Sequence, residues 1–432
     1  MKEVLINSLR LRLAAFFVLY FSQGLPLGLL GPVVSAWLAA NGASAGDIAL
    51  VGTATSLPWA LKFLLGFVID RYTFLPMGRR RIWIIGAQSL VMMVLIVGAV
   101  LSPTASDIHL IAALGFSINM CTSIHDVAVD GLAVDILEEE DRPRASAWMF
   151  GGQALGAAVA AVAGGLVVTN WGISPALLAI AFWFAGAMFF VVRVREREGE
   201  RGLPWESGQA HPANEQHKEI LWRTVLGSAF RALVAPASLL FLLVALVKGF
   251  QMGVFGGAAP LIATGSLGWE ADEFGVLAGA VTIIAALSGM ILGGRLGNRF
   301  GPARCLLAIL TIFLVLDFVA VSGLLNWESQ VAVIGFAVAW VISDVLMLIF
   351  LVAVAMSLCD KRAGAAQFTI YMALANLGTV AGAASVGLSD PLGGPPMLFS
   401  LTLLAHVLAA CVMILLIKSQ FRKAGTAKPA AA

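Results

Sequence analysis

Charged residues are scarce in this chain. Only 12% of its 432 residues are Asp, Glu, Lys or Arg, whereas 60% are hydrophobic and the mean hydropathy is +0.93. A soluble domain carries roughly 25% charged residues, because its surface faces water. A larger core would not remove so much surface charge, so the shortage excludes an ordinary soluble protein. The net charge of +2 gives no sign of a nucleic-acid partner, and we expect none.

Cysteines are few as well. The four of them lie in or beside apolar runs, with no CxxC motif and no Cys/His spacing typical of a metal site: Cys121, Cys305, Cys359 and Cys411. We therefore interpret them as small buried hydrophobic residues rather than redox or metal-binding groups. The sequence predicts no metal site and no cofactor.

The apolar residues are concentrated in long runs. A helix needs about 20 residues to cross the hydrocarbon layer, and lipid offers the backbone no hydrogen-bonding partner, so spanning segments are helices or closed barrels. Barrel strands alternate polar and apolar residues, and these runs do not. The sequence predicts twelve spanning helices, at 13–40, 47–69, 82–102, 108–135, 145–169, 173–192, 237–264, 274–293, 303–325, 329–358, 364–388 and 396–417.

The first run follows a basic segment, Met1–Arg12, and a secretory signal peptide is the alternative interpretation. Ala43-Ser44-Ala45 could imitate a cleavage site. A signal peptide has an apolar region of about 7–15 residues, and the run from 13 to 40 is nearly twice that length. We interpret it as the first span.

Loop charge tests this count. If both termini are cytoplasmic, Lys62 and Lys248 lie within spans, and the other 25 of the 27 Lys and Arg residues (27 − 2) lie in cytoplasmic segments. The outer loops carry only acids: Asp47, Asp107, Glu270, Asp272, Glu273, Glu328 and Asp390. Cytoplasmic loops are enriched in Lys and Arg. We expect a multi-pass protein of the cytoplasmic (inner) membrane, embedded in the lipid bilayer with both termini cytoplasmic.

The two halves of the chain are similar to each other. Gly66–Arg71 followed by Gly78–Arg81 lies between spans two and three, and the related 293–304 segment lies between spans eight and nine. We predict an all-α membrane protein with two pseudo-symmetric six-helix bundles. The expected domains are 1–192, a cytoplasmic linker at 193–236, 237–420 and a disordered tail at 421–432. We expect a monomer.

The fourth span carries the densest set of ionisable residues, His125, Asp126, Asp130 and Asp135. A charge at the centre of a span costs at least about 2.5–3.5 kcal/mol, so such residues need a reason. Asp126 and Asp130 are four residues apart and share a helical face. Two carboxylates so close cannot both be ionised without cost, so they are candidate proton carriers.

His125 is a second proton candidate, because its ordinary pKa of about 6.5 allows exchange near neutral pH. A hydrogen-bonded packing role is the alternative for His125, and a structural ion pair with Lys62 is the alternative for the aspartates. Other polar residues within spans complete the predicted solute and proton pathway: Lys62, Lys248, Gln251, Asp317, Asp344 and Gln23. Either lysine could neutralise an aspartate or bind an anionic group of a solute.

Several segments together resemble one branch of the major facilitator superfamily, the AmpG-type muropeptide permeases with their acetyl-coenzyme A and siderophore-transporting relatives. These segments are Gly24–Leu27, Leu61–Leu64 leading to Asp70–Tyr72, Gly78–Trp83, His125–Asp130 leading to Asp135–Leu137, and Gln367-Phe368. Their order and spacing cover nearly the whole chain. The resemblance implies alternating access, with a small-molecule solute bound between the halves and import driven by protons.

The resemblance also implies a cytoplasmic gate built on Asp70, Arg80 or Arg81, and Asp135. The further gate residues are expected to be Gly66, Arg71, Gly78, Arg142, Arg144, Arg295 and Arg299. Asn298 stands where the second copy of the loop would carry an acid. The alternative is that the consecutive arginines only set topology.

The chain departs from the branch in ways that leave the solute open. His125 stands where the family usually has Gln, and Leu132-Ala133 stands where muropeptide permeases have Trp-Lys. An acid near Gln251 is also missing. A siderophore or coenzyme-A-type solute is therefore the alternative to a muropeptide. A multipass enzyme is a remote alternative, because HExxH and nucleophile-elbow motifs are absent and the loops are short. A non-transporting receptor of the same fold has no supporting feature.

Overall fold

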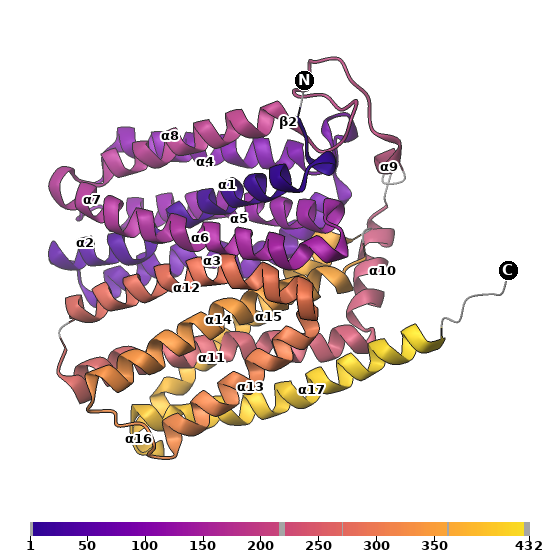
Figure 1. Ribbon diagram of the computed structural model, residues 1–432. Coiled ribbons are helices and arrows are strands. Elements are labelled where there is room, and N and C mark those ends of the chain that lie inside the picture. The colour runs from indigo at the N-terminus through magenta and orange to yellow at the C-terminus, as the bar shows by residue number, and fades with distance from the viewer. Residues whose placement is uncertain (1–2, 216–220, 270, 361–362, 427–432) are drawn as a thin grey trace. The chain divides into compact units, whose positions relative to one another are not determined.

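A computed structural model describes residues 3–215, 221–269, 271–360 and 363–426 (Figure 1). Within these residues, twelve helical segments are long and apolar enough to cross a membrane, which confirms the predicted twelve spans to within a few residues at most ends. They run over Leu9–Leu38, Leu50–Arg71, Arg81–Leu101, Ile108–Ile136, Glu139–Trp171, Ile173–Arg193, Pro236–Leu267, Val276–Phe300, Pro302–Val321, Gln330–Leu358, Gly364–Leu388 and Pro395–Lys418.

The elements that build these spans are almost all helices. The helices are α1 (Leu9–Gly28), α2 (Val34–Ala40), α3 (Ala45–Arg71), α4 (Arg81–Leu101), α5 (Ile108–Ile136), α6 (Arg142–Val159), α7 (Gly165–Trp171), α8 (Ile173–Arg193), α9 (Pro212–Glu215), α10 (Trp222–Leu233), α11 (Pro236–Leu267), α12 (Ala271–Phe300), α13 (Pro302–Val321), α14 (Gln330–Leu358), α15 (Gly364–Ser385), α16 (Ser389–Leu392) and α17 (Phe399–Thr426). Short strands β1 (Glu3–Val4) and β2 (Val194–Arg195) pair in parallel, with Glu3 opposite Val194.

Prolines explain the interruption in the first span. Pro26 lies inside α1, and Pro32 lies in the π-helical turn Leu29–Val33 that joins α1 to α2. A proline inside a helix removes one backbone donor and crowds the preceding turn. A similar π-helical turn, Ala160–Gly164, joins α6 to α7.

The chain divides into two compact units. Unit 1 comprises Met1–Ala229 together with Cys359–Thr369, and unit 2 comprises Phe230–Leu358 together with Ile370–Ala432. Most of the predicted linker thus belongs to unit 1, and so does the junction between α14 and α15. α17 includes residues 421–426 of the predicted tail, and residues 427–432 lie outside the described residues.

Small residues set the helix packing in both units. In unit 1, α1 lies against α6 so closely that a Cβ on Gly24 would lie 2.1 Å from the carbonyl oxygen of Gln153. In unit 2, a Cβ on Gly249 of α11 would lie 1.7 Å from the carbonyl oxygen of Ala375 in α15. Such contacts are typical of membrane helices, where the absence of a side chain permits close approach.

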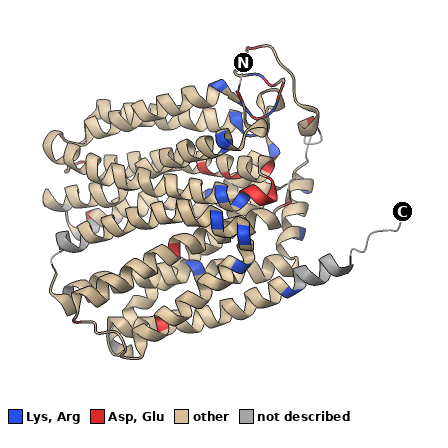
Figure 2. Cartoon of the chain, viewed as in Figure 1, with Lys and Arg blue, Asp and Glu red and all other residues tan. Residues whose placement is uncertain are grey.

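Charges are unevenly distributed in unit 1. Figure 2 shows Lys and Arg gathered at the end of its helices nearest the chain's N-terminus. We call this end, where α3 ends and α4 begins, the basic end of unit 1. At the opposite end, Asp47 lies in the first turn of α3 and Asp107 immediately precedes α5.

Candidate functional site

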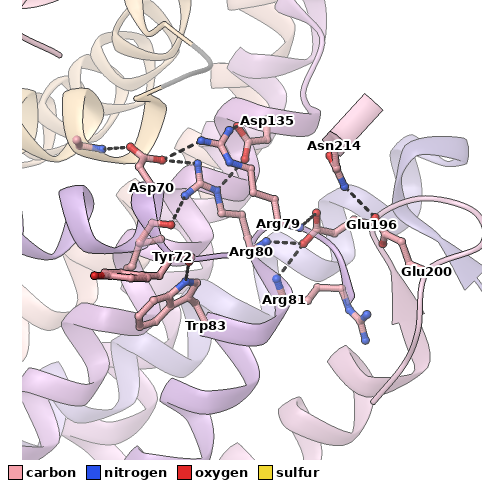
Figure 3. Close-up of polar contacts among 12 residues, drawn as sticks. Asp70, Tyr72, Arg79, Arg80, Arg81, Trp83, Asp135, Glu196, Glu200 and Asn214 are labelled. Carbon is pink, nitrogen blue, oxygen red and sulfur yellow. Dashed lines mark hydrogen bonds and ion pairs between the residues drawn. The ribbon is translucent and has the colours of Figure 1, made fainter. Parts of the chain in front are cut away.

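Two aspartates and two arginines form a buried cluster at the basic end of unit 1 (Figure 3). Asp70 is the penultimate residue of α3 and Asp135 that of α5, and both arginines directly precede α4. Arg80 donates to Asp70 Oδ1 at 2.7 Å and to Asp135 Oδ2 at 2.7 Å. Arg79 donates to Asp70 Oδ1 at 3.2 Å and to Asp135 Oδ1 at 2.9 Å. Each guanidinium therefore bridges the ends of α3 and α5.

The two arginines are not equivalent electrostatically. Burial disfavours the charged form of Arg80, but the carboxylates of Asp135 and Asp70 outweigh it and raise the pKa of Arg80 above its ordinary value. Burial and the charge of Arg80 lower the pKa of Arg79. Arg80 is thus the better compensated cation of the cluster.

Arg81 does not join these carboxylates. Its guanidinium donates to backbone carbonyl oxygens, at 2.8 Å to Arg201, 3.0 Å to Met77 and 3.1 Å to Val191. Of the two arginines expected from the resemblance, only Arg80 lies in the cluster, and Arg79 is its second member. Three consecutive arginines look alike in a sequence, and only the turn before α4 decides where each one points.

Glu196, which sequence reasoning missed, fixes that turn. Its carboxylate accepts the backbone N–H groups of Arg79 at 2.9 Å, Arg80 at 2.8 Å and Arg81 at 2.8 Å. These groups lie at the start of α4, where N–H groups have no partner within the helix and attract negative charge. Gly78 has a φ of 95°, and a Cβ there would lie 2.5 Å from the Glu196 carboxyl carbon. The linker acid therefore orients the arginines of the cluster.

Glu200 supports the loop that carries Glu196. It accepts the backbone N–H of Arg197 at 3.0 Å and the side-chain amide of Asn214 at 3.1 Å. Burial, with the neighbouring Glu196 charge, raises the pKa of Glu200 to about 8. No sequence pattern marked this pair of acids, because the linker is rich in Glu throughout.

The start of α15 belongs to this site. Asp70 Oδ2 accepts the backbone N–H of Ala366 at 2.9 Å, in the first turn of α15. A Cβ on Gly66 would lie 2.6 Å from Ala366 Cα. Gly131 similarly admits the Arg80 guanidinium, because a Cβ there would lie 2.9 Å from its Cζ. The site thus combines α3, α5, the turn before α4 and the first turn of α15.

The remaining predicted gate residues have other surroundings. Arg71 lies over the Tyr72 ring, 5.1 Å from its centre. Arg142 and Arg144 lie in the first turn of α6, and the buried Arg142 Nε has no hydrogen-bond partner among the described residues. In unit 2, Arg295 and Arg299 lie in the last turns of α12.

A second polar site lies inside the helices of unit 1. Lys62 Nζ donates to Asp126 Oδ2 at 2.7 Å, and their side chains are only 8% and 5% exposed. One turn further along α5, Asp130 accepts a hydrogen bond from the hydroxyl of Tyr20 in α1. The structure thus brings Lys62, Asp126 and Asp130 together. The spacing predicted a shared face for the two aspartates, and the ion pair with Lys62 is the one that the sequence offered as the alternative. The structure adds Tyr20, which sequence reasoning missed.

His125 and Gln23 lie in different surroundings. His125 Nε2 is 3.4 Å from Gln88 Nε2 in α4, and its ring lies edge-on to Phe184 of α8 at 6.4 Å. It is fully buried. Gln23 accepts a hydrogen bond from Gln153 at 3.2 Å, between α1 and α6.

Unit 2 holds a third polar site. Lys248 Nζ lies 2.8 Å from Asp344 Oδ1, and Gln251 donates to the same oxygen at 2.8 Å. Gln251 Oε1 contacts Nε2 of His406, whose Nδ1 lies 2.6 Å from Asp317 Oδ2. Lys248, Gln251 and Asp344 thus contact one another directly, and His406 joins the fourth predicted pathway residue of unit 2, Asp317, to them. Sequence reasoning missed His406, although an ionisable residue inside the predicted span 396–417 was a sufficient signal.

Comparison with known proteins agrees with this architecture. The family model described as Major Facilitator Superfamily matches residues 16–383. The chain is 27% identical over 379 residues to the anhydromuropeptide permease of Escherichia coli (strain K12), covering 85% of this chain and 72% of the relative. It is 27% identical over 316 residues to the putative transporter AmpG 4 of Rickettsia felis, covering 68% of this chain and 70% of the relative.

Solved structures show the same fold. A bacterial homologue of the iron transporter ferroportin, in an outward-facing state, superposes with a TM-score of 0.71 at 16% identity, covering 95% of this chain and 100% of that one. The transporter FucP in its outward conformation superposes with a TM-score of 0.71 at 12% identity, covering 94% of this chain and 98% of that one. With the family model matching most of the sequence, the chain belongs to the major facilitator superfamily and is an AmpG-like membrane transporter, not an enzyme.

Proposed function

We propose that the protein imports a bulky polar or anionic solute of the muropeptide type. Import is coupled to protons and proceeds by alternating access. The observation that carries the proton coupling is the buried site of Lys62, Asp126 and Asp130. It contains one cation and two carboxyl groups.

The charges of this site favour a bound proton. Lys62 and Asp126 neutralise each other at 2.7 Å. Asp130 then contacts the hydroxyl of Tyr20, and the nearby cation is already paired. A second ionised carboxylate in such a dry site is costly, so a proton on Asp130 completes the charge balance. Release of that proton would free Asp130 to compete for Lys62.

The muropeptide class rests on similarity to the Escherichia coli permease. Lys62 and Lys248 are lysines buried within spans, and either could bind an anionic peptide or sugar acid once its carboxylate partner releases it. A siderophore or coenzyme-A-type solute is the second candidate. It is favoured by Leu132-Ala133, which stands where the muropeptide permeases have Trp-Lys.

The Asp70–Asp135 cluster has the composition of a gate. Loop charges orient the basic end of unit 1 toward the cytoplasm of an inner membrane, with both termini on that side. A gate of this kind stabilises one conformation and breaks in the other. Asp70→Lys is therefore expected to slow turnover more than it weakens solute binding, because Lys would repel Arg80.

Uptake measurements test the proton site directly. Right-side-out vesicles containing the full chain would be given labelled anhydromuropeptide, with and without a protonophore. We expect Asp126→Asn and Asp130→Asn to abolish gradient-driven uptake while the protein remains inserted and elutes as a single species. Asp107→Asn, which alters an exposed residue outside the site, is the matched control.

Three results would decide against parts of the proposal. Wild-type uptake that is unchanged by the protonophore excludes proton coupling. Normal gradient-driven uptake by Asp130→Asn removes the assigned proton site. If anhydromuropeptide is not transported but a ferric siderophore or acyl-coenzyme A is, the second solute class replaces the first.

A further inference from the structure

Unit 2 contains a continuous chain of buried polar contacts across four helices. It runs from Lys248 and Gln251 of α11 through Asp344 of α14 and His406 of α17 to Asp317 of α13. His406 and Asp317 are fully buried. Burying so many polar groups in lipid-embedded helices is costly, and ionisable residues within spans mark functional sites.

The identity of each neighbour fixes where the protons lie. Asp344 is paired with Lys248 and is therefore an acceptor. Gln251 must turn its NH₂ group toward that acceptor, so its carbonyl oxygen Oε1 faces His406. A carbonyl oxygen only accepts hydrogen bonds, so the Nε2 atom of His406 must carry a proton.

The other ring nitrogen then shares one further proton with Asp317. Nδ1 and the carboxylate lie 2.6 Å apart, so a proton lies between them, on the imidazole or on the carboxyl group. In both cases the His406 ring makes two hydrogen bonds. Nε2–H donates to Gln251, and the shared proton joins Nδ1 to Asp317. The proton thus holds the ring to both neighbours at once.

Removing that proton leaves one N–H for two acceptors. A neutral imidazole donates from a single nitrogen, so His406 can hold Asp317 or Gln251, but not both. The contact with a carboxylate is the stronger one. His406 would therefore keep Asp317, and Gln251 would lose its donor. Gln251 would then be free to turn away from Asp344, which pairs with Lys248.

We propose that the His406–Asp317 pair is a second proton-binding site of the transporter, which controls the Lys248–Asp344 pair through Gln251. The charged groups that face His406 are Asp317 of α13 and, through Gln251, Asp344 of α14 and Lys248 of α11. The inference rests on the proposed proton-coupled function and adds a site in unit 2 to the one in unit 1.

Aromatic packing restricts how the pair responds. The Phe313 ring stacks on the His406 ring, with the ring centres 4.9 Å apart and an angle of 12° between the planes. Phe313 also contacts Trp340. The imidazole is thus held in its plane. A change of protonation is therefore more easily transmitted to Gln251 than absorbed by movement of the ring.

Histidine NMR tests the proton site without a transported solute. The full chain in detergent would be labelled at histidine, of which there are five, and His406 would be assigned by the signal missing from His406→Gln. We expect His406 to pass from two bound protons in the pair to one as pH rises, with Nε2–H exchanging to Nδ1–H. In Asp317→Asn the step should disappear. A single unchanging tautomer in the wild type would overturn the inference.

Proteoliposomes test the coupling. Labelled anhydromuropeptide uptake would be driven by a pH gradient and compared with counterflow exchange, which needs no net proton movement. We expect His406→Gln and Asp317→Asn to lose gradient-driven accumulation and to keep counterflow, while His109→Gln, an exposed control, keeps both. Unimpaired accumulation by both variants would overturn the inference. Wild-type uptake without gradient dependence would instead overturn the proposed function, and the NMR titration would still decide whether the proton site exists.

Discussion

The carboxylate of Glu196 accepts the backbone N–H of Arg80 at 2.8 Å, although 116 residues separate them in the chain. The same carboxylate also accepts the N–H groups on either side of it, those of Arg79 and Arg81. The linker that follows α8 therefore determines the orientation of the arginines that bridge Asp70 and Asp135.

The Glu196 carboxylate caps the N-terminus of α4, and its removal should destabilise the basic end of unit 1. Glu196→Ala leaves three buried N–H groups without an acceptor, and we expect it to lower the free energy of unfolding by about 2–3 kcal/mol. Glu196→Gln keeps one accepting oxygen and should cost less. The thermal unfolding midpoint in detergent measures both. Glu198→Ala, an exposed neighbour with one hydrogen bond to Asn7, should leave the midpoint unchanged. Equal midpoints for Glu196→Ala and Glu198→Ala would contradict the cap.

The raised pKa of Glu200 predicts a pH-dependent stability. Its pKa is about 8 in the folded protein against an ordinary value of 4.5, so between these values the folded state binds the additional proton. Stability from this group is complete below about pH 4.5 and falls as pH rises toward 8. Glu200→Gln stays neutral, so its unfolding midpoint should fall less than that of the wild type between pH 5 and 9. Parallel pH dependences of the unfolding midpoint for the wild type and Glu200→Gln would show that Glu200 is ionised in the folded protein.

The Gly66–Ala366 contact predicts a sharp steric effect. Gly66→Ala would place a Cβ 2.6 Å from a backbone atom that no side-chain rotation can move. The start of α15 would be displaced, and Asp70 would lose its hydrogen bond to Ala366. We expect turnover of labelled anhydromuropeptide to fall markedly. Gly86→Ala in α4, where a Cβ would meet nothing within 4 Å, is the matched control. Equal turnover by the two variants would remove this contact from the proposed gate.

The fold was largely predictable, because its main determinants are local. Each span needs a run of apolar residues, and lipid forces each run into a helix. The pairing of Lys62 with Asp126 was also within reach as an alternative, since a buried cation needs a buried anion. Span ends differ most at Phe300, seven residues after the predicted 293 (300 − 293), and at Glu139, six residues before the predicted 145 (145 − 139). In both places polar residues continue the helical segment beyond the apolar run that marks a span in the sequence.

What the sequence could not predict are contacts fixed by distant backbone. Glu196 acts on N–H groups, which every residue has, so no side-chain pattern marks its partners. His406 could have been noticed as an ionisable residue inside a span, but its partners, like those of Tyr20, depend on which helices lie next to it. The choice between Arg79 and Arg81 depends on one turn in which Gly78 has a positive φ.

His125 provides the final prediction, because the imidazole chemistry that made it a proton candidate does not determine which way the side chain faces. It lies one residue before Asp126, yet its ring contacts Gln88 and Phe184, whereas Asp126 and Asp130 contact Lys62 and Tyr20. We expect His125→Gln to retain protonophore-sensitive uptake, since a Gln side chain can still hydrogen-bond to Gln88. His125→Ala should instead lower the unfolding midpoint, because it leaves a buried cavity. If His125→Gln transports but no longer responds to the protonophore, His125 is a proton carrier after all.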